Sequence, residues 1–168
     1  MLERTIERLE SSNWRQWVKF NEDIALKNMN EVTLKYTNSL FYIRDDEGVL
    51  AYLAFRMFVS DGFLNGRWDR LKAYDAEKNY INPAKMWWFP GYDKYQRGME
   101  IARVDYIRTR NDYQNQGLGS RLIDALKIEH DMIELLSKKE KIGFYKKRGF
   151  IDSGLKSESG KPFMVWIK

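Results

Sequence analysis

In this sequence of 168 amino acids, the residues best suited to binding chemistry lie in a polar turn that leads into an amphipathic helix. The turn contains Gly117 and Gly119, and Ser120 and Arg121 follow directly. Because glycine has no Cβ, an anion can approach the backbone closely at both positions. The first amides of a helix lack an intrahelical acceptor and lie at the positive end of the helix dipole. The spacing therefore predicts a binding site for phosphate groups.

Two glycines before a helix also suit an ordinary turn, and the spacing alone leaves that alternative open. The segment is not a P-loop, since no Gly-Lys-Ser/Thr occurs, and it lacks the complete dinucleotide-binding fingerprint. The sequence has no cysteine, which excludes disulfides, thiolate zinc sites and a cysteine nucleophile. A single histidine, His130, disfavours a His-based metal cluster and a Ser-His-Asp triad, so we expect no metal.

The first third of the chain is predicted to form helices and then a hairpin. Apolar residues recur at helical spacing over residues 2–28. Polar residues 11–13 are expected to divide this stretch into two helices, with a serine or Asn13 as the N-cap. Residues 39–44 and 49–59 are typical of two strands joined by a tight, glycine-containing turn.

The elements around and after the polar turn follow from the same periodicities. Residues 100–109 alternate as a strand, and residues 118–129 have a helical period with one apolar face. Residues 132–137 fit either an extension of that helix or a strand. Residues 138–148 are expected to form a helix that Gly149 ends. Two short strands are predicted to follow, at residues 150–153 and 162–167.

This order of elements implies an α+β fold with α/β character, in which helices cover a sheet. No linker rich in Ser, Gly or Pro divides the chain, so we expect a single domain over residues 1–168. Residues 61–99 interrupt it as an aromatic-rich insert. No signal peptide and no run of roughly 18 apolar residues is visible. We therefore expect a cytoplasmic protein with no membrane partner.

Two motifs resemble those of the GNAT N-acetyltransferases. Residues 114–119, Gln-Asn-Gln-Gly-Leu-Gly, match that family's Gln/Arg-x-x-Gly-x-Gly/Ala signature, which follows a strand and holds the pyrophosphate of coenzyme A. Residues 144–150, Phe-Tyr-Lys-Lys-Arg-Gly-Phe, resemble a second hallmark, a helix that bears Phe/Leu-Tyr and ends in Gly-Phe. The resemblance implies a GNAT fold, with a central mixed, mostly antiparallel sheet of about six to seven strands and helices on both faces.

The resemblance also implies a co-substrate and residue roles. Acetyl-CoA would donate its acetyl group directly to a primary amine of an unidentified acceptor. Tyr145 would protonate the departing thiolate, and a phenol suits that step because its ordinary pKa, roughly 10, is close to that of an alkyl thiol. The implied contacts to the co-substrate are Ile107, Arg108 and Thr109 on the strand, then Gln114, Asn115, Gln116, Gly117, Leu118, Gly119 and Ser120.

The general base is less well defined. Related enzymes often place a glutamate on the strand before the signature, and the matching position here holds Arg103, which cannot accept a proton. Asp105 lies two residues further on and faces the same side of the strand, whereas Glu100 has the opposite parity. Asp105 is therefore the candidate base, and an ordinary surface carboxylate is the alternative.

The insert offers a candidate acceptor site. Trp87 and Trp88 could line a pocket whose π faces favour an aromatic or cationic amine. The alternatives are a hydrophobic lid packed on the sheet and a dimer surface, so a homodimer remains open.

Two other classes of function are alternatives. The first is a non-catalytic acyl-CoA-binding or sensing module. Arg103 favours it, and so does the lack of the Asn that commonly opens the last active-site helix, near Ser137 or Lys138. The second is a basic RNA- or protein-binding domain, although no nucleic-acid motif is present. The net charge of +5 fits a polyanionic ligand and equally a solubilising surface.

Overall fold

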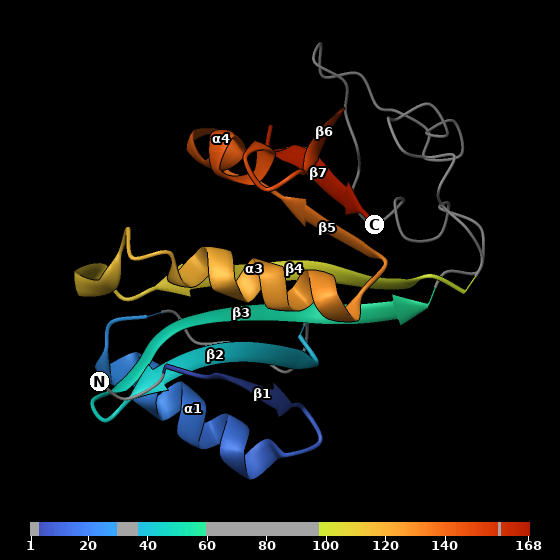
Figure 1. Cartoon of the computed structure of the whole chain (residues 1–168). Coiled ribbons are helices and arrows are strands. Elements are labelled where there is room, and N and C mark those ends of the chain that lie inside the picture. The colour runs from blue at the N-terminus through green and yellow to red at the C-terminus, as the bar shows by residue number, and fades with distance from the viewer. Residues whose placement is uncertain (1–3, 30–36, 60–97, 158) are drawn as a thin grey trace. The chain divides into compact units, whose positions relative to one another are not determined.

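The computed structural model describes residues 4–29, 37–59, 98–157 and 159–168 (Figure 1). Its strands form one seven-stranded sheet in the order β1-β2-β3-β4-β5-β7-β6. The elements are β1 (Ile6–Glu10), α1 (Trp14–Leu26), β2 (Ser39–Asp45), β3 (Gly48–Val59), β4 (Glu100–Thr109), α3 (Leu118–Glu129), β5 (Met132–Leu136), α4 (Ile142–Lys146), β6 (Ile151–Lys156) and β7 (Pro162–Ile167), with 3-10 turns η4 (Asn111–Tyr113) and η5 (Lys139–Lys141). The sheet and its helices confirm the predicted α+β class.

Contacts within the chain divide it into two compact units. The first unit contains residues 1–57 and 103–129, and the second contains residues 58–102 and 130–168. Strand β4 contributes its first three residues to the second unit and the remainder to the first.

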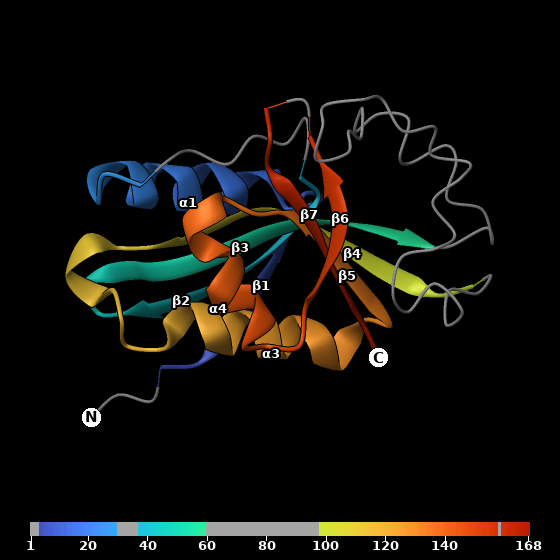
Figure 2. The ribbon, with the colours of Figure 1, turned by 90° about the horizontal axis from the view of Figure 1, so that it is seen from above.

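The first unit is an antiparallel arrangement of β1, β2 and β3 together with β4, α1 and α3. Its two helices lie on opposite faces of the strands (Figure 2). On α1, the buried residues Trp17, Phe20 and Ile24 follow the helical period and join a core cluster with Leu40 and Tyr52. Apolar burial on one face therefore holds α1 against the sheet.

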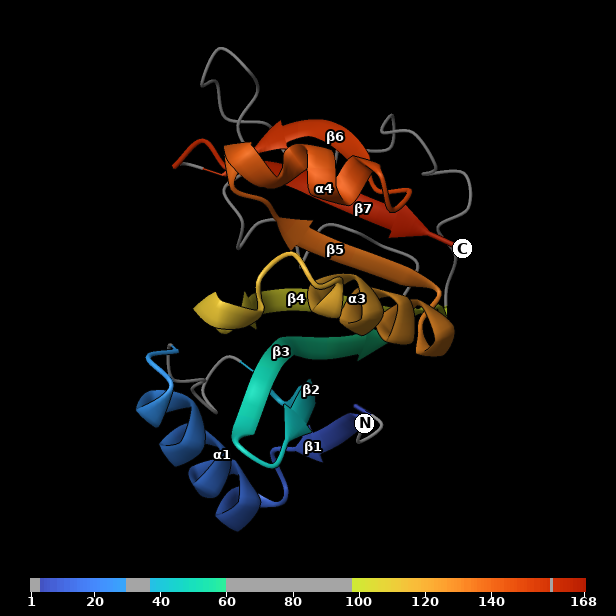
Figure 3. The same cartoon turned by 60° about the vertical axis from the view of Figure 1, so that its left-hand side comes forward.

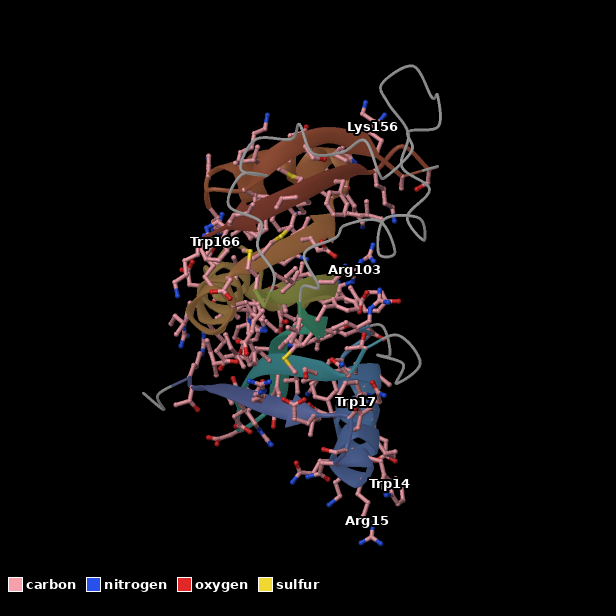
Figure 4. All side chains as sticks on the ribbon, turned by 90° about the vertical axis from the view of Figure 1, so that its right-hand side faces the viewer. Trp14, Arg15, Trp17, Arg103, Lys156 and Trp166 are labelled. Atoms are coloured by element: carbon pink, nitrogen blue, oxygen red, sulfur yellow. The ribbon has the colours of Figure 1, made fainter. Side chains whose placement is uncertain are left out.

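The residues at the two ends of α1 explain where the helix begins and ends, and its tryptophans show which side faces the strands. The Asn13 side chain accepts a hydrogen bond from the amide of Gln16, which confirms Asn13 as a predicted N-cap. Trp14 is 59% exposed and Trp17 is 1% exposed. Figure 4 shows Trp14 pointing away from the strands and Trp17 pointing toward them. The helix ends at Leu26, and Asn28, two residues further on, has a φ of 55°.

The predicted helix before Ser11 is wrong, because residues Ile6–Glu10 form the strand β1. The strand pairs with β2 along its whole length, from Ile6 opposite Ile43 to Glu10 opposite Ser39. The apolar spacing that suggested a helix covers too few residues to offset the cost of helix nucleation. The open edge of β2 supplies hydrogen-bond partners for the same backbone groups, so the strand is preferred.

The hairpin of β2 and β3 confirms the prediction for residues 39–59. Its turn is closed by the Asp45 side chain, which accepts a hydrogen bond from the amide of Glu47 at 2.8 Å. The Asp23 carboxylate on α1 accepts from the amide of Val49 at 2.7 Å. This bond ties α1 to the start of β3.

The second unit contains β5, α4, β6 and β7, in which β7 pairs antiparallel with both β5 and β6 (Figure 3). Residues Met132–Leu136 are a strand, which decides between the two alternatives left by the sequence. The predicted helix over residues 138–148 is shorter than expected, because η5 precedes the five residues of α4. Strand β6 begins at Ile151 and extends to Lys156, beyond the predicted end at residue 153.

No helix among the residues described above is both long and apolar enough to cross a membrane.

Candidate functional site

The predicted phosphate loop is a strand–turn–helix in which β4 leads through η4 into α3. Gly117 has a φ of 76°, and its carbonyl accepts from the amide of Arg121 at 3.1 Å. Gly117 is therefore the residue that caps α3, and the amides of Leu118 and Gly119 belong to the first turn, where no intrahelical acceptor exists. A Cβ built on Gly117 would meet no heavy atom within 4 Å. The backbone is thus open to a ligand at the expected position.

The position of this helix end is set by the apolar face of α3. Leu118, Leu122, Ile123 and Leu126 are all buried, as the periodicity predicts. By contrast, the residues from Gln114 to Gly117 are exposed. Burial of one face therefore anchors the helix, while the preceding loop faces solvent.

Arg110 lies between the end of β4 and the loop. Its guanidinium donates to both carboxylate oxygens of Asp112, at 2.7 and 3.0 Å, and lies 3.6 Å from Glu47. The hydrogen bond from Arg110 lowers the pKa of Asp112, and the same bond raises the pKa of Arg110. The Arg110 amide also donates to the carbonyl of Leu50 on β3 at 2.8 Å. These bonds join the loop to the sheet.

The residues predicted to meet the pantetheine arm lie at the end of β4. Ile107, Arg108 and Thr109 are half-buried. The Arg108 guanidinium donates to the carbonyl of Ile107 at 3.0 Å and lies 6.0 Å from the Tyr106 ring centroid. The end of β4 therefore runs directly into the phosphate loop, and both belong to the first unit.

Tyr145 lies on α4 in the second unit and is 6% exposed. Its ring packs edge-to-face against Phe144, with centroids 5.0 Å apart, and against Phe150, at 5.4 Å. The amide of Phe150 donates to the Tyr145 carbonyl, and the amide of Gly149 donates to the Lys146 carbonyl. With Gly149 at a φ of 81°, these are the two bonds of a Schellman cap. The Gly-Phe pair of the sequence motif therefore ends the helix and packs on Tyr145.

Asp105, the predicted base, is engaged in an ion pair. Both of its carboxylate oxygens accept from Arg56 on β3, at 2.7 and 3.1 Å. The hydroxyl of Thr37 donates to the same carboxylate at 3.1 Å. Asp105 and Arg103 are half-buried on one face of β4, whereas Ala102 and Val104 are buried on the other. The predicted parity is therefore confirmed, and the carboxylate holds β3, β4 and the chain before β2 together.

A second carboxylate was missed by the sequence reasoning. Glu134 on β5 is 1% exposed, and its neighbours Met132, Ile133 and Leu135 are also buried. The signal available in the sequence was an acidic residue inside a strand that is otherwise entirely apolar. Carboxylates are seldom fully buried unless they are paired, so an acid in this place is unusual. Glu134 is therefore a second candidate base.

Two further predictions concern residues beyond these elements. Trp87 and Trp88, the predicted acceptor-site residues, lie outside the described residues, as does the insert up to residue 97. Across the described parts of the chain, no group of three or more His, Asp or Glu residues could hold a metal ion.

Comparison with known proteins shows which proteins this chain is similar to. Residues 73–152, just under half of the chain, match the acetyltransferase (GNAT) domain. No curated protein matches the chain by sequence. A search of solved structures finds more distant similarity.

The chain is similar to the YlbP N-acetyltransferase of Bacillus subtilis, solved with coenzyme A, at a TM-score of 0.56 and 12% identity over 99% of this chain and 97% of that one. It is similar to an N-acetyltransferase of Staphylococcus aureus at 0.52 and 12% identity, over 98% of each chain. The ribosomal-protein-S18-alanine N-acetyltransferase of Escherichia coli gives a TM-score of 0.50 and 16% identity, over 98% of this chain and 94% of that one. At these identities the likeness shows a shared fold. The family match and the shared fold together confirm the resemblance to GNAT N-acetyltransferases that the two sequence motifs indicate.

Proposed function

We propose that residues 1–168 are a single N-acetyltransferase domain that moves an acetyl group from acetyl-CoA directly to a primary amine. The observation that carries this proposal is the open backbone at Gly117, at the start of a helix anchored by its apolar face. The match to the GNAT acetyltransferase domain and the coenzyme A bound to the Bacillus subtilis neighbour support the same ligand.

In this proposal the first unit binds the co-substrate. The amides from Gln116 to Ser120 would donate to the pyrophosphate, with Gln114 and Asn115 beside them, because the first turn of α3 leaves its amides without internal acceptors. The main chain of Ile107, Arg108 and Thr109 would pair with the pantetheine arm as an added strand does.

Tyr145 would act as the acid of the reaction. The amine nitrogen forms a bond to the carbonyl carbon, the carbon–sulfur bond breaks, and the thiolate takes the phenol proton of Tyr145. The proton that the nitrogen loses as the amide forms restores the phenol. The contacts of Tyr145 with Phe144 and Phe150 would fix the direction in which the hydroxyl points. Backbone amides would polarise the thioester carbonyl before attack.

A base must remove one proton from the ammonium before the amine can attack. We propose Asp105 for this role, as the sequence suggests, with Glu134 as the alternative. Protonation of Asp105 has to compete with Arg56 for the same two oxygens.

For the acceptor, we propose that Trp87 and Trp88 bind an aromatic or cationic amine through their π faces. The acceptor itself and a homodimer through the same insert are open to experiment.

A non-catalytic acyl-CoA-binding module is the second candidate function. The ion pair of Asp105 with Arg56 and the arginine at position 103 favour it, since neither provides a free base on β4. This candidate predicts binding of acetyl-CoA without turnover for any amine.

The test measures acetyl-CoA affinity by calorimetric titration and turnover against a panel of amines. Gly117→Ala should weaken acetyl-CoA binding about tenfold, because the new methyl group occupies the open approach to the backbone. Gly154→Ala is the matched control, since Gly154 has a similar φ of 79° and equally open surroundings in β6. Tyr145→Phe should keep the affinity and lower kcat by about 100-fold or more.

Each outcome assigns a function. Absence of acetyl-CoA binding by the native chain would overturn both candidates. Binding without turnover of any amine would select the non-catalytic module. Turnover that survives in Tyr145→Phe would show that another group protonates the thiolate.

A further inference from the structure

The phosphate loop is short of positive charge. Residues 111–120 contain no lysine or arginine and one acid, Asp112. Arg110 directly precedes the loop, but its guanidinium is already paired with Asp112 and Glu47. A ligand with several phosphate charges would therefore find backbone amides in this segment and no free cation.

Arg4, near the N-terminus of the first unit, lies against this loop. The Arg4 guanidinium, just before β1, donates to the side-chain oxygen of Gln116 at 3.2 Å. It also lies 5.2 Å from the centroid of the Tyr113 ring. Arg121, in the first turn of α3, donates to the carbonyl of Arg4 at 2.5 Å. Arg4 is thus held beside the loop at three points, although 112 positions separate it from Gln116.

Among the described residues, no acid forms an ion pair with Arg4. Within the same part of the chain, Arg121 makes none either, in contrast to Arg110. A guanidinium stacked on an aromatic ring loses little freedom when it binds a ligand, and its planar fork suits phosphate oxygens. Both cations lie at the end of α3 where the helix dipole is also positive.

We propose that Arg4 is a phosphate-binding residue for coenzyme A and supplies the cation that the loop itself lacks. Arg121 positions it by holding its backbone carbonyl. The inference rests on the proposed function, because coenzyme A is the ligand, and it adds a contact outside the family's two motifs. The shared chemistry is a phosphate group, either of the pyrophosphate or of the 3′-phosphate.

The test compares the native chain with Arg4→Gln, Arg4→Lys and Lys19→Gln. Lys19 is an exposed residue of α1, on the opposite face of the strands from α3, so Lys19→Gln removes the same charge away from the loop (Figure 2). Each variant is titrated calorimetrically with coenzyme A, 3′-dephospho-coenzyme A and inorganic pyrophosphate, at low and high salt.

We expect Arg4→Gln to weaken coenzyme A binding about tenfold, as loss of a charge-assisted hydrogen bond does. Arg4→Lys should lose less affinity than Arg4→Gln, because lysine keeps the charge but not the planar fork, and Lys19→Gln should bind as the native chain does. The loss should shrink at high salt, because added ions screen the same charge. A loss that persists with 3′-dephospho-coenzyme A assigns Arg4 to the pyrophosphate, and a loss that disappears assigns it to the 3′-phosphate.

Native affinity in Arg4→Gln would overturn the proposal. So would equal losses in Arg4→Gln and Arg4→Lys, since these would show that Arg4 acts through its stacking and not its charge. If the native chain binds pyrophosphate in an Arg4-dependent way but not coenzyme A, the proposed function fails and the phosphate site stands. If it binds neither, both fall.

Discussion

At the scale of single residues, two carboxylates compete for one role. Asp105 has three hydrogen bonds, from Arg56 and Thr37, and its side chain is 12% exposed. Glu134 is fully enclosed in β5. The first arrangement has an evident structural use, because it joins β3 to β4.

Replacing each carboxylate by its amide separates these roles. Asp105→Asn should lower the free energy of unfolding by about 2 kcal/mol, because Arg56 loses its charged partner. Of Asp105→Asn and Glu134→Gln, the variant that removes the general base should also lower kcat/KM by about 100-fold and flatten the acidic limb of the pH–rate profile. Urea unfolding and initial rates from pH 5 to 9 provide the two readouts.

A rate loss confined to Asp105→Asn would support the prediction from the sequence. A rate loss confined to Glu134→Gln would transfer the role to β5. Unchanged stability in Asp105→Asn would contradict the structural account of its ion pair with Arg56.

At the scale of elements, α1 and α4 end in the same way. In α1 the amides of Asn28 and Met29 donate to the carbonyls of Ala25 and Ile24, and in α4 Gly149 and Phe150 make the equivalent bonds. Each cap needs one residue with a positive φ. The cap on α4 also positions Phe150 against Tyr145, so the end of this helix and the proposed acid are one structural feature.

The conformation of Gly149 gives a prediction for α4. Gly149→Ala should lower the free energy of unfolding by about 1–2 kcal/mol, because an L side chain is strained at positive φ. Steric crowding adds little, since the nearest atom to a new Cβ would be 3.6 Å away on Trp166. Gly149→Asn should cost less, because asparagine tolerates this region.

Gly143→Ala is the matched control within the same helix. Gly143 has an open position inside α4, so alanine there should stabilise the chain by about 0.5–1 kcal/mol. Urea unfolding measures all three variants. Equal effects of alanine at positions 143 and 149 would contradict the assignment of the cap.

At the scale of the whole molecule, stability should depend on pH in the alkaline range. Burial raises the pKa of Tyr52 from 10.0 to about 12, and burial with the nearby Glu7 raises that of Tyr42 to about 12. Tyr52 is fully buried in the core cluster under α1. Tyr42 is only partly buried, so solvent screens its share.

The folded chain holds the Tyr52 proton more tightly than the unfolded chain does. Its stabilisation is therefore complete below pH 10 and is lost as the pH rises toward about 12. The loss should be on the order of 2 kcal/mol. Urea unfolding from pH 9 to 12 measures it, and Tyr52→Phe should decline less steeply than the native chain. Parallel declines in the two proteins would assign the effect to other groups.

Much of the first unit and the loop could be predicted because the signals are local. The apolar period of residues 118–129 gave the buried face of α3, and the turn between residues 44 and 49 gave the hairpin. The phosphate loop was predicted from Gly117, whose missing side chain and place before a helix are properties of neighbouring residues. Asn13 was found as a cap for the same reason.

Only the tertiary structure decided the features that depend on distant partners. Residues 6–10 became a strand because β2 offered them an edge. Asp105 met Arg56 and Thr37, and Glu134 was buried in β5. Arg4 reached the phosphate loop from the start of the chain. The local conformations and the chemistry of the loop follow from the sequence, because these depend on residues a few positions apart. The pairing of charges depends on which segments the sheet brings together, and no short-range pattern contains that information.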